Sequence, residues 1–272
     1  MESNTLIQGF DPEMMEPIVS RRDAISKGAS ASSKLMAALA LGSVPIALGA
    51  LAKDVYGQTP ADVLDVLQFA LLLEYLEGEF YTRGVAGVGL IPAADVVVFT
   101  QIRDHENLHI STLRSLITGR GATPGAKPPF DFTAKGNVPG FSFTGAAQYP
   151  TFMVLAQAFE DTGVRAYKGQ APRLMGDKAI LTAALSIHSV EARHASQVRR
   201  MRGQKGWITG NSRGDLPAFT QGIYNGDDTA MQAGLDITAL GTGNGGIGGV
   251  TEAFDEPLTK AEVTTIVTPF LA

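Results

Sequence analysis

The sequence predicts an all-α protein built around a four-helix bundle, and three observations support that prediction. Apolar residues recur at helical spacing in four long segments, and glycines and prolines separate these segments. The segments form two pairs with a short break inside each pair, while the stretch 119–149, rich in Gly, Pro and Phe, lies between the pairs. Each pair also carries the same pattern of glutamate and histidine. We therefore expect two antiparallel hairpins joined by a long crossover.

The predicted helices start and end at residues with matching local preferences. Thr59 suits a helix N-cap and Pro60 suits the first turn, whereas glycine runs follow the first two helices. The expected helices are Thr59–Gly84, Pro92–Leu116, Pro150–Gly169 and Asp177–Met201. We assign residues 53–202 to the bundle.

The remaining C-terminal residues, 203–272, form a Gly- and Asn-rich extension that we expect to be loose. Residues 241–249 approach low complexity. Thr259 and Glu262 have the spacing of a capping box, so a short final helix should follow Thr259.

The N-terminal 52 residues resemble a twin-arginine export signal. Arg21 and Arg22 precede an apolar run at 35–52, which ends in Ala50-Leu51-Ala52, a sequence that signal peptidase could cut. An uncleaved membrane anchor and an ordinary helix are the alternatives. We expect an exported bacterial protein, periplasmic or extracellular, that contacts a membrane only if residues 1–52 are retained.

The composition excludes some classes of binding partner and some kinds of metal site. The net charge is −5 at pH 7 and no Lys/Arg-rich run occurs, so we expect no nucleic acid partner. The 272 residues include no cysteine, which excludes thiolate metal sites, iron–sulfur clusters and disulfides.

All four histidines lie in two short windows, and each window contains Glu-x-x-His. The two motifs are Glu106 to His109 and Glu191 to His194. Residues three apart share a face of a helix, so one carboxylate and one imidazole can bind the same ion. A set of oxygen and nitrogen ligands without sulfur suits iron or manganese.

One further glutamate precedes each motif at a matching distance. Glu74 lies 32 residues before Glu106, and Glu160 lies 31 residues before Glu191. A helix rises about 1.5 Å per residue, so in an antiparallel hairpin each glutamate returns to the height of its motif. The sequence therefore predicts that side chains from four helices meet in one layer.

This pattern resembles the di-iron and di-manganese carboxylate proteins of the ferritin-like superfamily. The segments Leu73–Tyr81 and Phe254–Lys260 are also similar to exported bacterial ferritin-like domain proteins related to plant desiccation-associated proteins. The resemblance implies a ferritin-like bundle that binds two divalent ions, iron or manganese. The implied ligands are Glu74, Glu106, His109, Glu160, Glu191 and His194.

The resemblance also implies a role for each ligand. Glu106 and Glu191 would bridge the two ions, while Glu74 and Glu160 would be terminal ligands. Each histidine would serve one ion. Four carboxylates balance the charge of two divalent cations, which makes their burial tolerable.

Several neighbouring residues have more than one role open to them. Glu77 is either an extra ligand or a solvated or Arg-paired side chain. His188 is either a further ligand or a hydrogen-bond partner of one, whereas His105 points about 100° away from Glu106 on an ideal helix and is not expected to bind metal.

The roles of two acids and two tyrosines are also left open by the sequence. Asp104 and Asp161 either orient the histidines or pair with Arg103 and Arg165. Tyr81 and Tyr167 each follow a lone glutamate by seven residues. They would donate to ligand carboxylates, have a redox role, or serve only as buried aromatics.

The function expected first is an oxidoreductase that acts on dioxygen, peroxide or ferrous iron in stress protection. The alternative is an exported structural or protective protein whose metals only stabilise the bundle. Iron storage in a cage is a third hypothesis, and the long C-terminal extension argues against it. The expected partner is a small-molecule oxidant or metal ion, and a homo-oligomer is left open.

Overall fold

The computed structural model of the protein describes residues 60–272. The predicted export signal in residues 1–52 and the predicted Thr59 cap lie outside the described residues. Within the described part of the chain, no helix is both long enough and apolar enough to cross a membrane.

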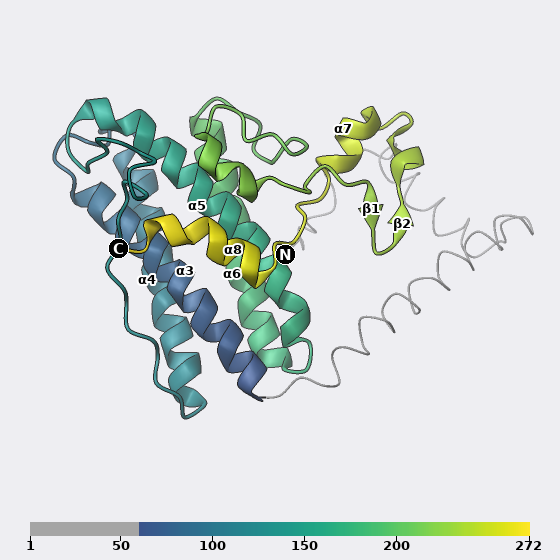
Figure 1. The fold of residues 1–272 in the computed structure, drawn as a ribbon, viewed down its shortest axis with the longest axis horizontal. Coiled ribbons are helices and arrows are strands. Elements are labelled where there is room, and N and C mark those ends of the chain that lie inside the picture. The colour runs from purple at the N-terminus through teal and green to yellow at the C-terminus, as the bar shows by residue number, and fades with distance from the viewer. Residues whose placement is uncertain (1–59) are drawn as a thin grey trace, which may run out of the picture. The chain divides into compact units, whose positions relative to one another are not determined.

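Four long helices form two hairpins, as the sequence predicts (Figure 1). In each hairpin the two helices pack along their length, α3 against α4 and α5 against α6. The four helices are α3 (Pro60–Ala86), α4 (Val96–Gly119), α5 (Tyr149–Gln170) and α6 (Lys178–Met201).

The helix ends differ from the prediction where local contacts override residue preferences. Helix α3 continues through Gly84 to Ala86, and the ring of Phe152 on α5 occupies the space that a Cβ at Gly84 would need. Helix α4 starts at Val96 instead of Pro92, because the amides of Asp95 and Val96 both donate to the Pro92 carbonyl in a preceding turn, at 2.9 and 3.2 Å.

The connection between the hairpins runs along α3 and explains how α5 comes to lie parallel to α4. At its start, the Gly125 amide donates to Gln68 Oε1 at 2.8 Å. At its end, the Gly145 amide donates to the Val88 carbonyl just beyond α3, at 2.9 Å. A short 3₁₀ turn, η1 (Ala146–Gln148), then leads into α5. Helix α5 therefore starts at the end of the bundle where α4 starts.

Phenylalanines of the connection complete the hydrophobic core. Phe80 on α3 is fully buried, and its ring stacks on that of Phe152 at a centroid distance of 4.7 Å. Phe132 and Phe143 of the connection pack against the Phe80 ring, at centroid distances of 5.4 and 5.6 Å. The phenylalanine-rich composition of this segment thus reflects packing on the bundle.

The C-terminal extension is irregular with short helices, as predicted, but it is not loose throughout, because its segments Ala218–Ile223 and Lys260–Val267 contact α5 of the bundle. Its elements are η3 (Ala218–Ile223), β1 (Met231–Gln232), β2 (Leu235–Asp236), η4 (Thr238–Gly241), α7 (Gly246–Thr251), α8 (Lys260–Val267) and η5 (Thr268–Phe270). The strands β1 and β2 form a two-stranded antiparallel hairpin. Buried apolar residues are spaced widely among glycines, which hides them from a reading of composition.

Helix α8 attaches the end of the chain to the bundle. Thr259 and Glu262 form the predicted capping box at its start. Val263, Val267 and Phe270 are buried in the same core as Phe80.

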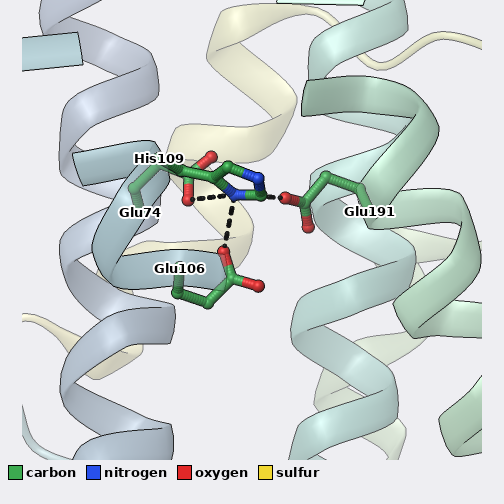
Figure 2. Close-up of side chains that lie close together, drawn as sticks. All are labelled: Glu74, Glu106, His109 and Glu191. Atoms are coloured by element: carbon green, nitrogen blue, oxygen red, sulfur yellow. Dashed lines mark hydrogen bonds and ion pairs between the residues drawn. The ribbon is translucent and has the colours of Figure 1, made fainter. Parts of the chain in front are cut away.

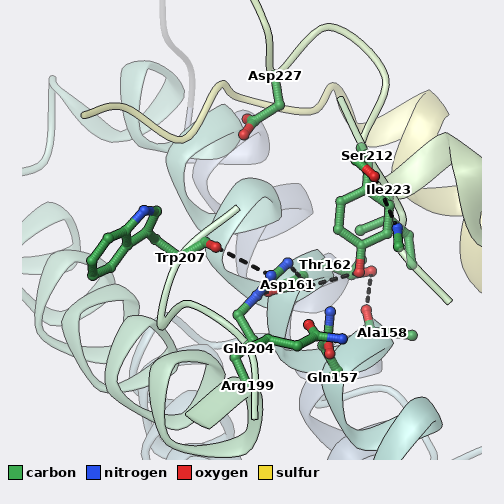
Figure 3. A network of polar contacts seen from close by, with 12 residues as sticks. Gln157, Ala158, Asp161, Thr162, Arg199, Gln204, Trp207, Ser212, Ile223 and Asp227 are labelled. Atoms are coloured by element: carbon green, nitrogen blue, oxygen red, sulfur yellow. Dashed lines mark hydrogen bonds and ion pairs between the residues drawn. The ribbon is translucent and has the colours of Figure 1, made fainter. Parts of the chain in front are cut away.

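A buried polar network attaches the first part of the extension (Figure 3). Asp161 on α5 accepts from Arg199 Nε and Nη2 on α6 at 2.8 and 2.5 Å, and from the Tyr224 hydroxyl at 2.7 Å. Arg199 also donates to the Trp207 carbonyl at 3.2 Å. Arg165, the partner considered for Asp161, instead lies 3.4 Å from Asp227.

Candidate metal centre

Six polar side chains come from the middle of the four long helices and point into the bundle. The four glutamates have no exposed surface, and the two histidines are also buried. Helix α3 provides Glu74, α4 provides Glu106 and His109, α5 provides Glu160, and α6 provides Glu191 and His194. These are the six residues that the sequence pattern selects.

The six residues form two overlapping groups, each compact enough to hold a metal ion. One group contains Glu74 and His109, the other contains Glu160 and His194, and both contain Glu106 and Glu191. Within each group, one ligand atom from every residue lies within 4.8 Å of all the others. The predicted convergence of six side chains at one height is therefore confirmed.

Both histidines direct Nδ1 toward the glutamates. His109 Nδ1 lies 3.0 Å from Glu106 Oε2 and 3.2 Å from both Glu74 Oε2 and Glu191 Oε1 (Figure 2). His194 Nδ1 lies 2.8 Å from Glu106 Oε1 and 3.4 Å from Glu160 Oε2. Glu106 thus presents one oxygen to each histidine, from a position between the two groups.

Two tyrosines hold Glu160 and Glu74 across the bundle. The Tyr81 hydroxyl on α3 donates to Glu160 Oε1 on α5, and the Tyr167 hydroxyl on α5 donates to Glu74 Oε1 on α3, both at 2.5 Å. Each tyrosine therefore binds the glutamate of the other hairpin. Oε2 of each glutamate remains directed at the cluster, so the tyrosines act here as hydrogen-bond donors.

Several inward-facing atoms are buried without a hydrogen bond among the described residues. They are Glu106 Oε1, Glu160 Oε2, Glu191 Oε1, Glu191 Oε2 and His194 Nδ1. Burial of such groups is costly unless something binds them. Carboxylate oxygens and imidazole nitrogens that converge on one space are the donors that iron and manganese use, so the residues fit a dinuclear metal site.

The pKa values of the cluster show how crowded its negative charges are. Desolvation raises the pKa of Glu74 to about 8, although the His109 imidazole partly opposes this. Desolvation and then the neighbouring Glu106 raise the pKa of Glu191 well above its usual value. Desolvation also acts on Glu106, but the adjacent imidazoles of His109 and His194 outweigh it and lower its pKa to about 2. The two imidazoles thus compensate one carboxylate far better than the others.

Glu77 is a fifth carboxylate at this cluster. It is buried, and desolvation followed by repulsion from Glu191 and Glu160 raises its pKa well above the usual value. A Cβ at Gly163 on α5 would lie 3.1 Å from Glu191 Oε2 and 3.3 Å from Glu77 Oε1, so both carboxylates face the same point of that helix. The interpretation of Glu77 as a solvated or Arg-paired residue is wrong. Its spacing from Glu74 was the available signal.

The other residues left open by the sequence have distinct positions. His188 belongs to neither group, and Asp104 pairs with Arg103 at the surface at 2.7 Å. Asp161 binds Arg199 and so does not orient a histidine. His105 also lies outside both groups, as expected, but its ring contacts that of His194.

The fold and the cluster together define a helical-bundle protein with a buried Glu/His site consistent with two metal ions. A family model described as Ferritin-like domain (Ferritin_2) matches residues 62–204, which is more than half of the chain. The protein therefore belongs to the ferritin-like domain family. No match to a curated protein was found. The narrower similarity to desiccation-associated proteins stays a prediction.

Proposed function

We propose that the cluster holds two divalent ions, iron or manganese. Glu106 and Glu191 would bridge the ions, because they are the two residues that both groups share. Glu74 and His109 would complete one ion's set of ligands, and Glu160 and His194 would complete the other. The observation that carries this proposal is the set of buried carboxylate oxygens without hydrogen bonds that face a common space.

We further propose that the protein is an oxidoreductase acting on dioxygen, peroxide or ferrous iron, in a stress-protective role. An iron or manganese pair, when bound, would pass electrons to dioxygen or peroxide, and ferrous iron would be the electron donor where it is the substrate. The chain itself holds Glu160 and Glu74 in position through Tyr81 and Tyr167 and buries all four glutamates away from bulk water. Export to the periplasm or exterior is part of the proposal and rests on Arg21-Arg22 and the apolar run that follows.

Metal analysis of the purified protein tests the first step. We expect two equivalents of iron or manganese in the natural chain and a loss of both in a Glu106→Ala/Glu191→Ala double variant. A Glu79→Ala/Glu252→Ala double variant is the matched control, because both residues form surface ion pairs with lysines away from the cluster. A natural chain that stays metal-free after incubation with iron and manganese would contradict the proposal.

Turnover separates the oxidoreductase from the structural alternative. Iron- or manganese-loaded protein should oxidise ferrous iron or consume peroxide, and the double variant should not. If chelation lowers the melting temperature while no turnover of any of these substrates occurs, the metals only stabilise the bundle. Sedimentation as a large shell would instead support iron storage.

A further inference from the structure

His105 forms a hydrogen bond with the far side of the His194 ring. His105 Nδ1 lies 2.9 Å from His194 Nε2, while His194 Nδ1 faces Glu106 and Glu160. The two ring planes differ by only 11° and their centroids are 5.2 Å apart. That separation is too long for face-to-face stacking and suits two rings joined edge to edge by an N–H···N bond.

The direction of this hydrogen bond follows from the proposed role of His194. A histidine that binds metal through Nδ1 needs a lone pair on that atom, so its proton sits on Nε2. His194 Nε2 then donates to His105 Nδ1, and His105 carries its own proton on Nε2. Ligand histidines usually donate their other N–H to a partner that fixes the ring and tautomer. His105 is placed to be that partner.

The same two histidines line a surface pocket of about 340 Å³ between α4 and α6. The other lining residues are Val98, Gln101, Ile102, Val190, Arg193 and Gln197. Arg193 is the charged member of this set, which includes no carboxylate. The lining therefore favours small uncharged or anionic molecules over a divalent cation such as ferrous iron.

A second pocket reaches Tyr167 near the start of α3 and the end of α5, but its small size argues against a role in access. It has an apolar lining and a volume of only about 20 Å³. Such a space holds about one water molecule. Of these two pockets, the one beside His105 is the better candidate for access, and a further pocket of about 250 Å³ is lined by none of the six cluster residues.

Resting on the proposed dinuclear site, we propose that the pocket between α4 and α6 is the entrance to the metal centre for small uncharged or anionic molecules. His105, which lines this pocket, is the positioning residue of His194. An oxidant of that kind, such as peroxide, therefore reaches the centre by this route, whereas ferrous iron is disfavoured as the substrate.

Titration calorimetry of metal-free protein with Mn²⁺ tests the positioning role. His105→Leu removes the acceptor, and we expect it to weaken the binding of one of the two ions by about 10- to 100-fold. His105→Gln keeps an oxygen that can accept from His194 and should recover most of the affinity. Gln101→Leu alters the same pocket one turn away and should bind both ions as the natural chain does.

Two results would overturn the positioning role, and neither is confused with failure of the metal site itself. His105→Leu could bind both ions with unchanged affinity, or His105→Gln could be as weak as His105→Leu. A natural chain that binds no Mn²⁺ would instead contradict the proposed function. Unchanged circular dichroism of each variant establishes that it is folded.

Azide, a small anion that binds ferric ions, tests the entrance. In oxidised, iron-loaded protein, Gln197→Trp should fill the mouth of the pocket and slow azide association several-fold. Arg193→Glu should also slow it by reversing the charge of the lining. Leu185→Trp is the control, since Leu185 is exposed on the same helix and lies outside the pocket. Equal rates in Gln197→Trp and Leu185→Trp would overturn the proposed route.

Discussion

At the scale of single residues, the centre combines more negative charge than its two histidines can neutralise. Glu191 has no exposed surface and no hydrogen bond to either oxygen among the described residues, and it lies beside Glu106 and Glu77. We expect such a residue to destabilise the metal-free bundle.

Glu191→Gln tests this expectation. We expect the metal-free variant to be more stable than the natural chain, because the raised pKa of Glu191 means that at neutral pH the natural chain must either bury a charge or take up a proton when it folds, and the amide does neither. A gain of ~1 kcal/mol would raise the melting temperature by about 2–4 °C in a domain of this size. The rise in melting temperature on adding Mn²⁺ should shrink or vanish. Calorimetric scans with and without Mn²⁺ measure both, and a less stable metal-free variant would contradict the expectation.

The hydroxyls of Tyr81 and Tyr167 should contribute to the stability of the bundle, because each binds a buried glutamate. Tyr81→Phe leaves Glu160 Oε1 buried without its donor, which costs about 1–3 kcal/mol of unfolding free energy. Urea unfolding measures this loss. Tyr149→Phe is a suitable control, because that hydroxyl donates to the half-exposed Asp95 at the start of α4. Equal losses of unfolding free energy in the two variants would show that burial of the acceptor at the cluster does not increase the cost of losing the hydrogen bond.

The sequence already indicated the six residues of the cluster but could not indicate the contacts between the hairpins. Glu-x-x-His spacing and matched heights along antiparallel helices are local properties, so six residues could be selected from them. The bonds from Tyr81 to Glu160 and from His105 to His194 depend on how α3 meets α5 and how α4 meets α6. No spacing within one helix specifies those angles, and ideal helix geometry even placed His105 away from the site.

At the scale of elements, the same distinction holds for helix ends. Asp177 was expected at the start of the fourth helix, and its carboxylate caps α6 by accepting from the Ile180 amide at 3.1 Å. It also pairs with Arg120 at the end of α4, a contact between hairpins that the sequence did not indicate. Gly84 was expected to end α3, yet the helix continues to Ala86, with the ring of Phe152 packed against Gly84.

The Asp177 cap gives a stability that depends on pH. The hydrogen bond from the Ile180 amide, followed by the Arg120 contact, lowers the pKa of Asp177 below its usual 3.8, despite some desolvation. The unfolded chain therefore binds this proton more readily, and the cap's contribution is complete above pH 4 and falls as the pH drops below it.

Two substitutions at this position check that sign. Asp177→Ala should cost about 1 kcal/mol at pH 7 and less at pH 3. Asp177→Asn keeps an oxygen for the Ile180 amide and should lose less than the alanine variant at pH 7. Urea unfolding at pH 7 and pH 3 gives the comparison. A cost for Asp177→Ala that does not change with pH would assign the effect to helix propensity.

At the scale of the whole molecule, the ferritin-like match and the folded unit do not end at the same place. The match stops at residue 204, whereas Leu258, Val263 and Phe270 are buried in the core of the bundle. Widely spaced apolar residues in a Gly-rich segment give no periodic signal, which is why this packing could not be predicted from the sequence.

A chain that ends at Gln204 should therefore unfold at a much lower urea concentration than the full chain. The truncation uncovers the apolar face that α8 and η5 occupy. Phe270→Ala in the full chain isolates one part of this contact and should cost about 3–5 kcal/mol. Trp207→Ala serves as a control in the same extension, because its side chain is 43% exposed. Equal stability of the truncated and full chains would show that the extension is dispensable.

The crossed tyrosines bear on how the centre is assembled. Each hairpin carries one terminal carboxylate together with the phenol that orients the carboxylate of its neighbour. Neither half of the bundle, made on its own, would present a correctly aimed half-site. We therefore expect tight metal binding to appear late in folding, after the two hairpins have docked. Metal binding followed during refolding would then measure the docking of the hairpins.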